Sequence, residues 1–233
     1  MLIWTFADIH IFNNIGVTYA NLEDFSNALK FHDKALKNQI NILGEIHPDV
    51  AVTYNNIGYC NFLQGNCSKA LEFYNKALNI LLTTLGENHP KIAISYSNIG
   101  AIYCQQHDYN KALEYHNKAL NILIKTFGEN HPYVATSYNN IGETYCYQYD
   151  FSKALDYFYK ALDILSNTIG ENHPNVVMSF CNIAHSYFVL GNYTKALEYY
   201  NKALKISTNI WGPEHNNTKM IKVLIDEIIV VDE

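Results

Sequence analysis

The stretch that decides the fold runs from residue 90 to residue 131 and reads PKIAISYSNIGAIYCQQHDYNKALEYHNKALNILIKTFGENH. The same pattern returns every 42 residues, most visibly in a Lys-Ala-Leu triplet. That triplet occupies Lys34–Leu36, Lys76–Leu78, Lys118–Leu120, Lys160–Leu162 and Lys202–Leu204. A strict period of this size predicts stacked units, each of which is too small to bury its own apolar face.

Within each repeat, the apolar residues have the spacing of two successive helices. Pro90 suits the first turn of a helix, and the apolar residues that follow it share one helical face. A second helix is expected to run from about Tyr109 until Gly128 stops it, because glycine tolerates the left-handed position after a helix. Large residues alternate with small ones across such a pair, so we expect Tyr103 and Tyr145 to be buried.

One series of residues resembles the signature of tetratricopeptide repeats nearly position for position: Tyr96, Ile99, Gly100, Tyr103, Ala112 and Ala119. The 42-residue length and the Gly-Glu-Asn-His-Pro turn are similar to the repeat variant of kinesin light chains. The resemblance covers about residues 7–215. It implies an all-α fold, a right-handed α-solenoid of five antiparallel helix pairs plus a C-terminal capping helix.

We expect one repeat domain over residues 1–233. Its repeats cover about residues 7–47, 48–89, 90–131, 132–173 and 174–215, and the capping helix covers about residues 216–231. Residues 220–231 are apolar on too many sides to form another ordinary unit. Residues 1–12 are apolar and lack a helix cap, so either another repeat precedes them or this N-terminal end pairs with another surface.

The composition disfavours nucleic acid and membrane partners. The net charge is −6, and all 16 basic residues are lysines, whereas specific base contacts and bidentate phosphate contacts use mostly arginine. The N-terminal residues do not lead us to expect a signal peptide, and no apolar run approaches the roughly 18 residues of a membrane span. The five cysteines show no C-x-x-C spacing, so we interpret them as buried thiols in a reducing compartment, the cytoplasm.

The family resemblance implies a peptide-binding groove lined by the first helix of each pair. The groove residues that it implies are Asn14, Asn55, Asn56, Tyr59, Phe62, Asn98, Asn139, Asn140, Glu143, Tyr147, Asn182 and His185. A ladder of side-chain amides offers both donors and acceptors to an extended peptide, and the aromatic rings offer pockets for its side chains. An alternative is that these asparagines bond to neighbouring helices and set the geometry of the repeat; the two interpretations are compatible.

The residues at the groove positions also predict the charge of the partner. Tetratricopeptide domains that capture chaperone C-termini use a clamp of lysine and arginine, and the matching positions here are Val17, Asn55, Tyr59 and Ala101. The resemblance therefore excludes that clamp. A neutral or basic peptide is expected rather than an acidic one, with Glu143 as its ion partner.

Catalysis and metal binding are not expected. His47, His89, His131, His173 and His215 recur with the period, and four of them precede proline. Neighbouring repeats lie on the roughly 8–10 Å scale of helix packing, whereas zinc ligands lie about 2 Å from the metal, so these are turn residues and no metal site is predicted. No phosphate loop, H-E-x-x-H or G-x-S-x-G motif occurs, and no cofactor is expected.

The resulting functional hypothesis is a protein–protein interaction module that acts as an adaptor or scaffold. Two alternatives stay open. The chain could be an architectural solenoid that self-associates through its N-terminal end, or a regulatory repeat domain of a larger multidomain protein.

Overall fold

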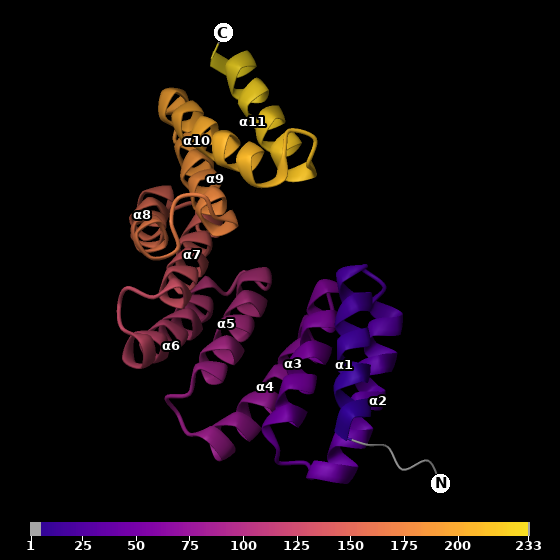
Figure 1. Cartoon of the computed structure of the whole chain (residues 1–233). Helices are drawn as coiled ribbons and strands as arrows, with labels where there is room; N and C mark the ends of the chain where they lie inside the picture. Colours follow the sequence, from indigo (N-terminus) through magenta and orange to yellow (C-terminus); the bar gives the residue numbers. More distant parts are fainter. Residues whose placement is uncertain (1–5, 233) are drawn as a thin grey trace. The chain divides into compact units, whose positions relative to one another are not determined.

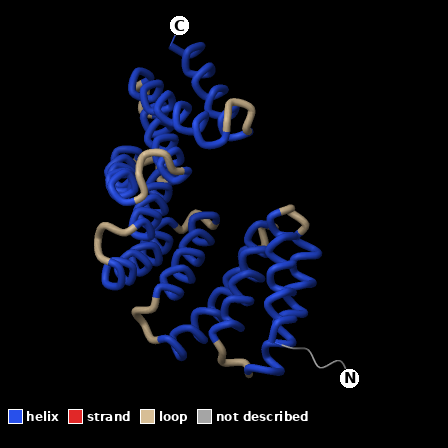
Figure 2. Tube along the Cα trace, viewed as in Figure 1, coloured by secondary structure: helices blue, strands red, loops and turns tan. Residues whose placement is uncertain are grey.

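A computed structural model describes the backbone of residues 6–232 and the side chains of residues 11–231, and every regular element in this part of the chain is a helix (Figures 1 and 2). The helices are α1 (Phe6–Asn21), α2 (Phe25–Leu43), α3 (Pro48–Leu63), α4 (Cys67–Leu85), α5 (Pro90–Gln105), α6 (Tyr109–Phe127), α7 (Pro132–Tyr147), α8 (Phe151–Thr168), α9 (Pro174–Val189), α10 (Tyr193–Trp211) and α11 (Asn216–Asp232). The predicted all-α fold is confirmed. Among these helices, none combines the length and apolar character needed to cross a bilayer.

Consecutive helices pack in adjacent pairs, as in an α-solenoid. The chain divides into two compact units, residues up to 122 (unit 1) and residues from 123 onward (unit 2), and the division falls within α6. In unit 1, α1 pairs with α2 and α3 with α4; in unit 2, α7 pairs with α8 and α9 with α10. Helix α11 covers α10, as predicted for a capping helix.

Two predictions about the whole chain remain predictions. One is a single repeat domain over residues 1–233. The other is self-association through residues 1–12, of which residues 1–5 lie outside the described part of the chain.

Four periodic histidines are the N-caps of the first helices α3, α5, α7 and α9. His131 is the N-cap of α7: its Nδ1 accepts a hydrogen bond from the backbone N–H of Tyr133 at 3.2 Å, and Pro132 takes the first helical position. The same side-chain cap is present at His47, His89 and His173. These side chains supply a partner to an otherwise unpaired backbone donor, which confirms that they are turn residues.

In the first four pairs, a ring of the second helix packs against a glycine of the first helix. A Cβ atom placed on Gly142 would lie 2.6 Å from Cε1 of Phe158, and one placed on Gly100 would lie 2.6 Å from Cε1 of His116. These contacts leave no room for a side chain, so glycine allows the two helices to approach closely.

The expectation that Tyr103 and Tyr145 are buried was wrong, because both are half-buried. They lie at the edge of the helix pair, where the Tyr103 ring stacks on Tyr115 at 5.5 Å between centroids. The Lys111 ammonium covers the outer side of the Tyr103 ring at 5.2 Å from its centroid. The full cost of a cavity is therefore not expected at these two positions.

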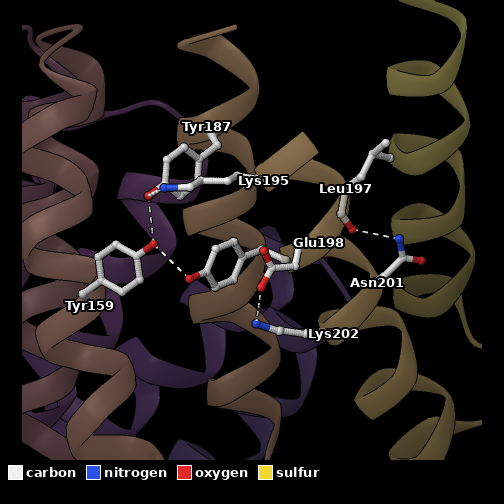
Figure 3. A network of polar contacts seen from close by, with 8 residues as sticks. Tyr159, Tyr187, Lys195, Leu197, Glu198, Asn201 and Lys202 are labelled. Carbon is white, nitrogen blue, oxygen red and sulfur yellow. Dashed lines mark hydrogen bonds and ion pairs between the residues drawn. The ribbon is translucent and has the colours of Figure 1, made fainter. Parts of the chain in front are cut away.

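A cluster of tyrosines ties three helices of unit 2 together (Figure 3). The Tyr159 hydroxyl of α8 hydrogen-bonds the Tyr187 hydroxyl of α9 at 3.0 Å and the Tyr199 hydroxyl of α10 at 2.9 Å. Lys195 Nζ donates to the Tyr187 hydroxyl at 3.4 Å. These bonds position α9, which carries two of the predicted groove residues.

Candidate functional site

The candidate site is the set of residues at five recurring positions on the first helices, which we call the first-helix face. Its positions are the asparagine before Ile-Gly or Ile-Ala, the residue preceding it, and the residues three, six and seven places after it. First helices of neighbouring repeats contact each other within each unit, α1 with α3, α3 with α5, and α7 with α9. The predicted groove residues of one unit therefore lie on helices that contact each other.

The asparagines before Ile-Gly have unoccupied side-chain amides. Asn56, Asn98 and Asn140 are half-buried, and Asn14 is exposed. Among the described residues, the amides of Asn56, Asn98 and Asn140 make no hydrogen bond with the protein. A half-buried amide without a partner in the described chain keeps its donors and its acceptor unused.

The asparagines one position earlier have a different role. Asn139 is buried, and its Nδ2 donates to Ser179 Oγ on the next first helix at 3.5 Å. Asn55 makes the equivalent bond to Ser95 Oγ at 3.4 Å. At both residues the side-chain Oδ1 is buried without a partner in the described chain. The geometry-setting interpretation thus applies to Asn55 and Asn139.

Three aromatic residues on the first-helix face are open to different degrees. Tyr59 and Tyr147 are exposed by 47% and 58%, respectively, whereas Phe62 is half-buried. His185 is also exposed, and its ring lies edge-on to Phe151 at 6.4 Å between centroids. This ring contact with Phe151 accounts for the position of the His185 side chain.

Glu143 is the charged member of the predicted groove residues. Its side chain is exposed, yet the surrounding helices displace enough water to raise the pKa of its carboxyl group. The neighbouring Asn182 amide lowers that pKa and offsets part of the effect. The contact does not meet the geometry of a hydrogen bond, since Asn182 Nδ2 has no hydrogen-bond partner in the described chain. The Glu143 side chain is thus exposed, whereas the Asn182 Nδ2 atom is buried.

The thiols near this face are not activated. Burial raises the pKa of Cys146 to about 11 and that of Cys181 to about 12. Both are therefore neutral thiols at pH 7, and a nucleophilic cysteine would need the opposite shift.

Most lysines lie on the second helices, away from the first-helix face. Lys118 shows the recurring arrangement: its Nζ lies 2.6 Å from Glu114 Oε1 and 4.9 Å from the centroid of the Tyr115 ring. Lys76 and Lys202 form the same ion pair in their repeats. This placement leaves the first-helix face nearly free of positive charge.

Sequence reasoning missed the part of this face that lies on α11. Glu227 follows Glu143 by two periods of 42 residues, and Val223 and Val230 stand where Cys181 and Phe188 stand in α9. The same alignment that identified the other groove positions would have identified these residues. They were assigned only to a capping role because the repeat signature fades after residue 215.

Comparisons with known proteins agree with this arrangement. The tetratricopeptide repeat family matches residues 8–83, 91–167 and 142–209. No curated protein matches the chain. Among solved structures, BtubC (BKLC) from P. vanneervenii is 25% identical with a TM-score of 0.73, and the match covers 89% of this chain and 83% of that one.

Two further structures share the fold at lower identity. A putative kinesin light chain with nearly identical TPR-like repeats from Podosopora anserina is 18% identical, with a TM-score of 0.69 over 87% of this chain and 96% of that one. The apo form of RapI is 19% identical, with a TM-score of 0.70 over 86% of this chain and 70% of that one. The repeat period, the helix pairs and the family match lead to one conclusion: the chain belongs to the tetratricopeptide repeat family, and its structural relatives include repeat proteins of the kinesin light chain type.

Proposed function

We propose that this protein is an interaction module that binds an extended or partly helical segment of a partner protein along the first-helix face, as an adaptor or scaffold. Proteins of this repeat family generally mediate protein–protein interactions. The observation that carries the proposal for this chain is the unoccupied amides at the same repeat position in each unit, Asn56 and Asn98 in unit 1 and Asn140 in unit 2. Each can bond to a backbone N–H or C=O of a bound segment, so together they favour main-chain recognition.

The partner segment is proposed to be neutral or basic. Glu143 is the one formally charged residue at the recurring positions of α1, α3, α5, α7 and α9. A lysine or arginine of the partner next to this carboxylate would stabilise its ionised form and lower its raised pKa. Binding of a basic segment should accordingly strengthen as the pH rises through the pKa of Glu143.

A random dodecapeptide library displayed on phage tests the proposal. The wild-type protein should enrich a set of peptides, and the double variant Asn98→Ala and Asn140→Ala should lose at least about tenfold in affinity for them. Neither side chain bonds to the described protein, so the far-UV circular dichroism and the midpoint of thermal unfolding should stay unchanged.

The matched control is the double variant Asn79→Ala and Asn209→Ala. These two asparagines are exposed on the second helices α4 and α10, and their loss should leave peptide affinity within about twofold, as for surface changes outside an interface. Equal affinities for the two double variants would contradict the assignment of the first-helix face. Failure to enrich any peptide, together with concentration-dependent assembly in light scattering, would replace the proposal by the architectural alternative.

A further inference from the structure

An open apolar pocket lies between α9 and α11 in unit 2. It has a volume of about 520 Å³ and is lined by Phe188, Val223, Asp226, Glu227, Val230 and Val231. Val223, Val230 and Val231 are exposed by 54%, 74% and 55%, respectively. Contiguous exposed apolar surface of this kind marks an interaction site more often than scattered apolar residues do.

The pocket continues the first-helix face. By the 42-residue period, Glu227 occupies the position of Glu143 and His185, and Val223 that of Asn139. Amide side chains on α7 and α9 thus give way to apolar ones on α11. A segment bound along α7 and α9 would reach a site of different chemistry at α11.

Two positions of α11 that are buried in α9 do not share this apolar character. In α9, which packs against the second helix α10, Val177 and Ala184 are buried. Their counterparts in α11 are Lys219 and Asp226, and both are exposed. Charges at these positions disfavour the packing of another second helix there. The exposed valines are therefore not explained as the seam of a further helix pair.

We infer that this pocket holds a large apolar side chain of the partner segment, next to a lysine or arginine that faces Asp226 and Glu227. The pocket lining contains two carboxylates and no cation, so its charge complements a basic neighbour of the apolar residue. Its volume lies within the range of about 300–1,000 Å³ that ligand pockets occupy, which suits an aliphatic or aromatic anchor. The inference rests on the proposed function, because the anchor belongs to the same segment that is proposed to bind along α7 and α9.

The test uses peptides enriched from the random dodecapeptide library by the wild-type protein, resynthesised with a fluorescein label. They should contain a leucine, phenylalanine or tryptophan adjacent to a lysine or arginine. Val230→Asp should weaken their binding by at least about tenfold, because it places a charge where the anchor sits. The matched control is Met220→Asp, which puts the same charge at a 60%-exposed position of α11 outside the pocket and should change binding by less than about twofold.

The contribution of the pocket carboxylates to binding can be tested separately. Glu227→Gln should lower the affinity for a lysine-containing peptide by about two- to fivefold, the range of an exposed ion pair. It should not change the affinity for the same peptide with that lysine replaced by glutamine. Equal binding by Val230→Asp and Met220→Asp, with binding still lost in the Asn98→Ala and Asn140→Ala variant, would overturn the pocket and leave the proposed function standing. A dimer that Val230→Asp converts to a monomer would also overturn it, since a second copy would then fill the pocket. Failure to enrich any peptide would overturn both.

Discussion

The core of α1–α2 and the core of α7–α8 solve the same packing problem with different chemistry. His32 and Phe158 occupy the same position three repeats apart, and each is only 1% exposed. Cβ atoms placed on the facing glycines, Gly16 and Gly142, would each lie 2.6 Å from a ring carbon. The space is thus the same, and it accepts either an imidazole or a phenyl ring.

The surroundings of the two rings differ accordingly. Asn13 Oδ1 accepts a hydrogen bond from His32 Nδ1 at 2.9 Å, and Asn13 Nδ2 donates to Thr53 Oγ1 at 2.6 Å. The Thr53 hydroxyl donates in turn to Gln39 Oε1 at 2.6 Å. Phe158 packs instead with buried apolar residues that include Leu155 and Ile183. The repeat geometry therefore tolerates a polar core where the polar groups satisfy one another, and that core should respond to pH.

The largest effect is expected from a change in the apolar core of α7–α8. Phe158→Ala removes a buried ring and should destabilise unit 2 by about 3–5 kcal/mol. Amide hydrogen exchange should show lost protection in α7, α8 and α9. The tyrosine cluster gives a milder control, because Tyr159→Phe removes two hydroxyl bonds and should cost about 1–2 kcal/mol. Equal losses in the two variants would mean that Phe158 is not a core residue.

Acidification should destabilise unit 1 more than unit 2. Burial lowers the pKa of His32 and of His116 from 6.5 to about 4, so the unfolded chain binds these protons more readily than the folded chain. The stability of unit 1 should be complete above pH 6.5 and fall as the pH drops toward 4, by roughly 3 kcal/mol per histidine over the whole window. Unit 2 has no buried histidine among its described residues, and the raised pKa of Glu143 gives the opposite sign there.

Hydrogen exchange at pH 7, 6 and 5, corrected for the intrinsic exchange rate, would measure this difference. Protection should fall in α1–α5 and stay nearly constant in α7–α10. A loss of protection that is equal in both units would contradict the assignment to His32 and His116, since carboxylates are distributed over both.

The hydrogen-bonded chain around His32 can be broken at its centre. Thr53→Val keeps the shape of the side chain and leaves Asn13 Nδ2 and Gln39 Oε1 without partners in the interior, which should cost about 2–3 kcal/mol. Ser179→Ala is the matched change in unit 2. Its bond from Asn139 is long at 3.5 Å, so its loss should cost less than about 1 kcal/mol. Chemical denaturation of both variants gives the comparison, and similar midpoints would show that the short bonds of unit 1 contribute no more than the long one.

The sequence predicted the helix pairs because the period, the proline starts and the glycine stops are all local signals. Gly128, for example, has a φ of +84° directly after α6, as expected for a stop. The cores were predicted less well. The residue type of His116 does not indicate a core position. Its place in the core is apparent only from the period, which aligns it with His32, Tyr74, Phe158 and Tyr200.

The turn between the two helices of a pair was also beyond prediction. Its left-handed residue is Gly65 in the second repeat but Tyr149 in the fourth, with a φ of +60°. A bulky residue with positive φ costs roughly 1–2 kcal/mol and carries no sequence signal, so only the packing of the helices on either side determines it. The candidate site shows the same limit: the period aligns Asn55 with Asn139, but their bonds to the next helix depend on side-chain geometry.

His116 offers the finest test, because it combines features of both cores. It is 3% exposed like the other rings, but its Nδ1 has no hydrogen-bond partner in the described chain. His116→Phe should therefore stabilise unit 1 at pH 7 by about 1 kcal/mol, since it removes a buried unsatisfied nitrogen and reproduces the phenyl ring that Gly142 accepts. His32→Phe should instead destabilise the protein, because it deprives Asn13 Oδ1 of its donor. Urea unfolding of the two variants at pH 7 measures this difference. If both midpoints moved in the same direction, the packing of the ring, and not a hydrogen bond to its nitrogen, would determine which residue this position accepts.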